Sequence, residues 1–138
     1  MFGFTKKHKL DEFGRSELHY AARDADAKLT EKLIRRGNNV NLTDKQGWTP
    51  LHFAAQAQAT EVATVLLDAG AQLDLQDIHG NTPLFKAVFA SNGNGDMIKL
   101  LRARGANAFC ENKHGQTPVG LARLIANYDV KQYFADLP

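Results

Sequence analysis

Cysteine, serine and long apolar runs are all scarce in this chain of 138 residues, and each scarcity excludes a class of protein. Because Cys110 is the sole cysteine, no disulfide can form within the chain. No apolar run approaches the roughly 20 residues that a membrane-spanning helix needs. The start of the chain places its lysines after its apolar residues, which is the reverse of a secretory signal. We therefore expect a cytoplasmic protein without stable membrane association.

A large excess of charge of either sign is also missing. The formal net charge is +2 at pH 7, and Lys6, Lys7 and Lys9 near the start account for all of that excess. The rest of the chain lacks the broad basic face that nucleic-acid-binding proteins carry, so no nucleic acid is expected as a partner. An apolar content of 43% is enough for a packed core, and the length suits one compact unit.

Motifs for catalysis or cofactor binding are equally sparse. Ser16 and Ser91 lie in no nucleophile motif, and the Gly-Asn-Gly stretch at 93–95 lacks the third glycine of a dinucleotide-binding loop. His79 and His114 occupy matching positions, but no paired Cys or His spacing provides the further ligands of a metal site. The sequence therefore predicts no enzyme, no cofactor and no metal.

One short pattern recurs along the chain. Gly-x-Thr-Pro-Leu stands at 47–51 and at 80–84, Gly-x-Thr-Pro-Val stands at 115–119, and a degenerate copy stands at 14–18. The four glycines are spaced by 33, 33 and 35 residues. A fixed period of this size indicates stacked helical repeats. Such stacks present extended surfaces instead of catalytic clefts.

The second copy of the pattern shows how each repeat is expected to fold. Turn residues at 44–47 precede Thr49, whose hydroxyl can cap a helix, and Pro50 suits the first helical position. Apolar residues at helical spacing within 51–55 and 62–67 then predict two helices, and Gly70 ends the second one. Each repeat is thus a helical hairpin that follows a turn.

The other repeats depart from this plan at particular places. The third repeat has two extra residues within 90–96, which predict a longer and more mobile link between its helices. Arg102 falls at a position that is apolar in the first two repeats, so the outer surface is expected to be locally polar there. The end repeats are atypical, as capping repeats are. Three residues are expected to seal the apolar end of the stack: Val130, Tyr133 and Phe134.

These residues resemble the ankyrin repeat family over 11–137. The family pattern Gly-x-Thr-Pro-Leu-His-x-Ala-Ala is intact at 47–55, and the later Leu-Leu-x-x-Gly-Ala stands at 66–71. The resemblance implies an all-α repeat solenoid, an ankyrin stack of helix-turn-helix units joined by β-turn or hairpin loops. It implies a hydrogen-bonding role between turns for His19 and His52. The four repeats are expected at about 11–43, 44–76, 77–111 and 112–138, after an N-terminal leader at 1–10.

The resemblance also implies a protein-binding role, because ankyrin domains are recognition modules. In the family, turn tips and first helices line a concave surface. The matching positions here are Phe13, Arg15 and Arg23 in the first repeat, Lys45, Gln46, Trp48 and Gln56 in the second, Ile78, His79, Asn81 and Phe89 in the third, and Lys113 and His114 in the fourth.

Two of these aromatic residues have alternative interpretations. Trp48 either contacts a partner, as tryptophan often does at interface hot spots, or lies flat against an adjacent turn. Phe89 either contacts a partner or packs against the long link that follows it. If exposed, both would form an apolar strip with Phe13 and Ile78, and such strips mark binding sites.

Two functional hypotheses follow from these features. The first is a non-enzymatic inhibitor or immunity-type protein that is monomeric when free and masks a partner protein, such as a toxin or an enzyme. The alternative is an adaptor or accessory subunit that tethers two partners and uses the leader as its second surface. An enzyme ranks last.

Overall fold

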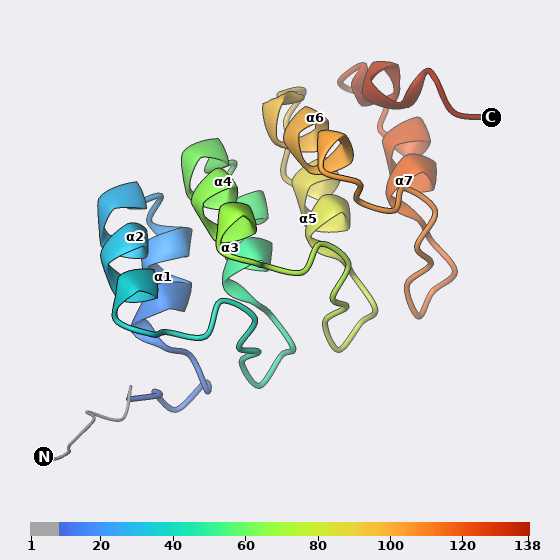
Figure 1. Cartoon of the computed structure of the whole chain (residues 1–138). Helices are drawn as coiled ribbons and strands as arrows, with labels where there is room; N and C mark the ends of the chain where they lie inside the picture. The colour runs from blue at the N-terminus through green and yellow to red at the C-terminus, as the bar shows by residue number, and fades with distance from the viewer. Residues whose placement is uncertain (1–8) are drawn as a thin grey trace, which may run out of the picture.

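The computed structural model describes residues 9–138, and within that range it contains seven α-helices, one 3-10 helix and no β-strand. An inner row of helices and an outer row run side by side, with long loops projecting at one end (Figure 1). The inner row consists of α1 (Glu17–Arg23), α3 (Pro50–Gln56), α5 (Pro83–Phe89) and α7 (Pro118–Leu124). The outer row consists of α2 (Ala27–Arg35), α4 (Thr60–Asp68) and α6 (Asp96–Ala103), followed by the 3-10 helix η1 (Val130–Phe134). The all-α repeat stack predicted from the sequence is thereby confirmed.

The first helix of each repeat begins as the sequence predicts. Thr49, Thr82 and Thr117 each accept a hydrogen bond on the side-chain oxygen from the backbone N–H three residues later, and a proline follows each of them. Ser16 makes the corresponding capping box in the first repeat. These caps satisfy N–H groups that a helix start leaves without a partner. Each helix therefore starts at a fixed distance from its turn.

The core lies between the two rows of helices. Leucines 18, 51 and 84 of the inner row and residues 33, 66 and 101 of the outer row are almost completely buried. Alanines at 21–22, 54–55 and 87 are also buried, which lets neighbouring inner helices approach closely. At the C-terminal end, Val130 and Phe134 are buried and Tyr133 is half-buried, so the cap that the sequence predicts is present.

The turn tips form a continuous row along one edge of the stack. An Asp or Asn begins each tip, and its Oδ1 accepts two backbone N–H groups at 2.9–3.0 Å; these residues are Asp11, Asp44, Asp77 and Asn112. Backbone hydrogen bonds then join neighbouring tips, from Lys45 N to Phe13 O (2.9 Å), Ile78 N to Gln46 O (3.0 Å) and Lys113 N to His79 O (2.9 Å). The loops are therefore held in register with one another.

The link between α5 and α6 is longer than its counterparts, as predicted. It comprises residues 90–95, against 24–26 and 57–59 in the first two repeats. The C-terminal cap covers this link, because the Tyr133 hydroxyl donates to Gly93 O at 3.1 Å and the Tyr133 ring lies directly against Gly95. These contacts restrain the link, so the greater mobility expected from its Asn-Gly pairs has no support in its packing.

Two further sequence expectations concern the N-terminal leader and membrane-spanning helices. Most of the leader expected at 1–10 lies outside the described residues. Within residues 9–138, no helix has the length and apolar character needed to cross a membrane.

Candidate functional site

Two rows of positions differ in all four repeats while the surrounding pattern stays similar. The first row follows the tip glycine and holds Arg15, Trp48, Asn81 and Gln116. The second row lies on the inner helices, three residues before the helix ends, and holds Tyr20, Phe53, Lys86 and Leu121. Variation within an otherwise repeated frame is the pattern expected of a recognition surface.

Side chains from these two rows interleave along the first three repeats. The Arg15 guanidinium lies 5.9 Å from the Tyr20 ring centroid and 5.1 Å from that of Phe53. The Trp48 and Phe53 ring centroids are 4.8 Å apart, and Lys86 Nζ lies 4.5 Å from the Trp48 ring centroid. We call Tyr20, Arg15, Phe53, Trp48 and Lys86 the cation–aromatic ladder. Each of its contacts is at a distance that favours cation–π or aromatic attraction.

Buried carboxylates hold the two cations of the ladder. Arg15 Nε donates to Asp44 Oδ2 at 2.9 Å, and Lys86 Nζ faces Asp77 Oδ2 at 3.8 Å. Both aspartate side chains are completely buried. The hydrogen bond from Arg15 to Asp44 raises the pKa of the guanidinium further, so Arg15 is charged at all relevant pH values. Asp44 and Asp77 thus each fix their loop through Oδ1 and face a cation of the ladder through Oδ2, whereas Asp11 Oδ2 accepts from the Tyr20 hydroxyl.

A shallow hollow of about 340 Å³ opens beside the ladder. Five residues that the sequence predicts for the partner surface line it: Arg15, Gln46, Trp48, Gln56 and His79. Phe53 and Lys86 complete the lining, and sequence reasoning missed both. The sequence does mark this position. Phe53 and Lys86 occupy the variable third position of Leu-His-x-Ala-Ala, and the residue there differs from repeat to repeat.

Trp48 is half-buried in this arrangement. Its ring packs on Phe53 and beneath the ammonium of Lys86, so it contacts helix side chains of its own and the next repeat. It does not simply lie flat on an adjacent turn, and one side of it borders the hollow. Partner contact through Trp48 therefore remains a prediction that the geometry permits.

The other predicted residues lie outside the hollow. Phe13 and Ile78 are 48% and 43% exposed at the tips, and Phe89 is 70% exposed, so its packing against the long link is minimal. These three do not line the hollow with Trp48, and the apolar strip expected from the sequence stays a prediction. Arg23 pairs with Asp24 at 3.0 Å, and Asn81 accepts a hydrogen bond from Asn112 at 2.8 Å. The remaining three are exposed at the tips: Lys45, Lys113 and His114.

The buried histidines serve the turns, as the resemblance implies. His52 Nδ1 accepts from Thr49 N at 3.1 Å, and its Nε2 donates to Asn81 O in the next repeat at 2.9 Å. His19 makes the same connection between Ser16 N and Trp48 O, at 3.0 Å each. Burial lowers the pKa of His52 to about 4 and also lowers the pKa of His19. Both side chains are therefore neutral near pH 7.

Groups suited to catalysis or metal binding do not converge at this surface. Burial raises the pKa of the Cys110 thiol, which disfavours the reactive thiolate. His79 and His114 are exposed at neighbouring tips. Across the described residues, no group of three or more His, Cys, Asp or Glu side chains is placed to hold a metal ion.

Comparison with known families places this architecture in a defined class. The model of a family described as ankyrin repeats, in three copies, matches residues 18–112, which is more than half of the chain. The protein therefore belongs to the ankyrin repeat family, whose members generally act as protein-interaction modules. No curated protein matches the chain in sequence.

Proposed function

We propose that this protein is a non-enzymatic intracellular inhibitor or immunity-type protein that masks a partner protein with its concave face. The partner is a protein such as a toxin or an enzyme, and the free chain is a monomer. The observation that carries the proposal is the hollow beside the cation–aromatic ladder, lined by side chains that vary between otherwise similar repeats.

The rigidity of this face supports a masking role. Tip-to-tip hydrogen bonds and capped helices fix the backbone on which the ladder stands. A preformed surface loses little conformational freedom on binding, which favours tight association. An interface of standard size buries about 800 Å² on each partner, enough to cover an active site. Occupation of a partner's active site in this way is sufficient for inhibition.

A matched pair of variants tests whether the hollow is the binding surface. Gln56→Arg places a bulky cation at an exposed position in the hollow, whereas Gln72→Arg makes the same change at an exposed position outside it. Tagged wild-type and variant proteins are used to capture partners from a lysate of the source cells. Gln56→Arg should lose the captured protein while Gln72→Arg retains it. Loss with both variants, or with neither, contradicts the assignment of the hollow.

The inhibitory role needs a separate measurement. The captured partner is purified, and its activity or toxicity is measured with increasing amounts of the ankyrin protein. Suppression that is complete near one equivalent, and that Gln56→Arg abolishes, is the expected result. A partner that binds tightly and keeps its full activity would contradict inhibition while leaving the binding surface intact.

An adaptor is the alternative function, and one observation favours it. Phe89 on α5 and Leu124 on α7 occupy equivalent positions, and both are exposed, at 70% and 69%. They lie outside the hollow and offer a second apolar surface besides the leader. If the protein tethers two partners, Phe89→Ser or deletion of 1–10 should abolish one interaction and spare the other.

A further inference from the structure

The hollow beside the ladder is rich in hydrogen-bond donors that have no acceptor. Arg15 donates through Nε to Asp44 and also interacts with the Tyr20 side chain, which leaves further guanidinium N–H groups for a ligand. Lys86 Nζ makes no hydrogen bond within residues 9–138, because Asp77 Oδ2, the oxygen that it faces, is 3.8 Å away. The amide groups of Gln46 and Gln56 add further donors at the rim. A ligand group that fits this lining must supply acceptors.

The arrangement of charge around the hollow selects an anion. Two cations and no Asp or Glu line it, while the carboxylates of Asp44 and Asp77 are completely buried below. Asp77 Oδ2 has no hydrogen-bond partner in the described part of the chain, although it is buried. Each cation therefore lies between a buried carboxylate and the open hollow. The buried acids cancel the formal charge at long range, so selectivity arises from short-range hydrogen bonds at contact.

Aromatic rings of the ladder, together with Phe13 beside it, prepare the two cations for such contact. Phe13 and Phe53 lie 4.8 Å and 5.1 Å from the Arg15 guanidinium, and Trp48 lies 4.5 Å from the Lys86 ammonium. Long cationic side chains lose considerable rotamer freedom when they bind a ligand. The aromatic rings and the buried aspartates already restrict the rotamers of Arg15 and Lys86 in the free protein. Binding therefore costs less side-chain entropy.

We propose that the protein partner inserts an Asp or Glu side chain into this hollow, where its carboxylate accepts hydrogen bonds from Arg15 and Lys86. This inference rests on the proposed function, because it names the chemistry that the concave face recognises. A volume of about 340 Å³ admits one or two such side chains together with water.

Nuclear magnetic resonance with defined peptides tests the inference without knowledge of the partner. The ¹⁵N-labelled full chain is titrated with capped tetraglutamate, and the Trp48 indole N–H and Arg15 Nε–H resonances are followed. Capped tetraglutamine, capped tetralysine and an oligothymidylate serve as comparison ligands. Tetraglutamate should shift both resonances saturably, and Lys86→Met should weaken its binding about tenfold, which is the value of one charge-assisted hydrogen bond. Lys86→Arg should restore binding, and Lys32→Met on α2 should have no effect.

Several outcomes overturn the inference. Equal binding of tetraglutamine or tetralysine removes the charge selectivity, and stronger binding of the oligothymidylate assigns the hollow to another class of partner. An unchanged affinity in Lys86→Met, or shifts confined to α2, excludes this site; if Lys86→Met does not fold, Lys86→Gln replaces it. The proposed function is tested separately: if Gln56→Arg loses the captured partner while Lys86→Gln keeps it, the carboxylate assignment fails and the binding surface stands.

Discussion

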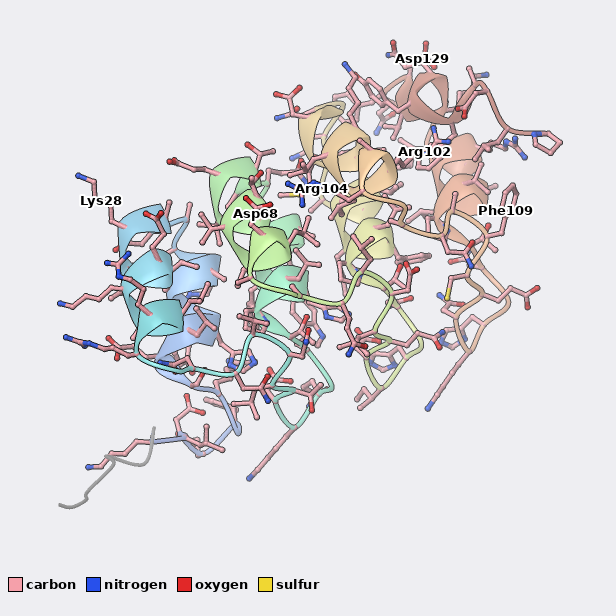
Figure 2. All side chains as sticks on the ribbon, in the orientation of Figure 1. Lys28, Asp68, Arg102, Arg104, Phe109 and Asp129 are labelled. Carbon is pink, nitrogen blue, oxygen red and sulfur yellow. The ribbon has the colours of Figure 1, made fainter. Side chains whose placement is uncertain are left out.

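Arg102 and Asp136, which lie 34 residues apart, form a bidentate ion pair in which both nitrogen–oxygen distances are 2.8 Å. Arg102 Nη1 also donates to the Tyr133 carbonyl at 2.7 Å, and its guanidinium lies 5.2 Å from the Phe134 ring centroid. Figure 2 shows Arg102 on α6, beside the C-terminal segment. Arg102, for which the sequence predicts a locally polar outer surface, therefore joins α6 to the C-terminal cap.

Loss of this contact should loosen the cap. Arg102→Met removes the hydrogen bond to Tyr133 and the pair with Asp136 but keeps an apolar stem over Phe134. We expect faster amide hydrogen exchange in 130–137 and a decrease of about 1 kcal/mol in the free energy of unfolding. Arg104→Met is the control, because Arg104 pairs at 2.8 Å with an exposed Asp68 away from the cap (Figure 2). Equal exchange rates in the two variants would contradict the assigned role.

The buried histidines should make stability depend on pH in a defined window. The pKa of His52 is about 4 in the folded chain against 6.5 for an ordinary histidine, so the unfolded chain binds the proton more readily. Protonation of His52 therefore does not reduce the free energy of unfolding above about pH 6.5. As the pH falls from 6.5 towards 4, the free energy of unfolding decreases by up to about 1.4 kcal/mol per pH unit for one histidine. His19 adds to this in the same direction.

Urea unfolding between pH 7 and pH 5 measures this dependence, since most carboxylates stay ionised there. His52→Gln should reduce the slope of the unfolding free energy against pH by the contribution of one titrating histidine. A His52→Gln slope identical to that of the wild type would show that another group titrates.

The packing of one tip against the next should make equivalent glycines unequal. Gly47 and Gly115 have nearly the same backbone conformation, with φ of 78° and 75°. A Cβ on Gly47 would lie 2.9 Å from Asp77 Cα, whereas a Cβ on Gly115 would meet nothing within 4 Å. Gly115→Ala should cost about 1 kcal/mol for the left-handed backbone alone. Gly47→Ala should cost about 1–3 kcal/mol more because of the clash, as measured by urea unfolding. Equal costs would mean that the tips separate easily.

Trp48 should contribute to stability as well as to recognition. Its ring packs on Phe53 and beneath Lys86, so Trp48→Ala should lower the free energy of unfolding by about 1–2 kcal/mol. Gln46→Ala, in the same hollow but exposed, should change stability by less than about 0.5 kcal/mol. Equal unfolding free energies for wild type and Trp48→Ala would show that the ladder adds nothing to the fold.

The hollow proposed as the binding surface was predictable only in part. The positions after the tip glycines place Arg15 and Trp48 at the hollow because the turn chemistry fixes where those residues point. Phe53 and Lys86 were missed because the inner-helix residues predicted for the surface, Arg23, Gln56 and Phe89, all lie at the ends of their helices. Only comparison of the four repeats at the position of Phe53 and Lys86, which is aromatic in two repeats, cationic in one and aliphatic in one, distinguishes it from the buried alanines that follow.

The sequence by itself determined the repeat period, the helix starts and the buried stripes, because these depend on hydrogen bonds and spacings among residues a few positions apart. Only the tertiary structure decided which variable side chains meet across repeats, as Trp48 meets Lys86 and Arg102 meets Asp136. Those contacts join residues more than 30 positions apart, and their geometry depends on how one hairpin is offset against the next, which no local pattern records.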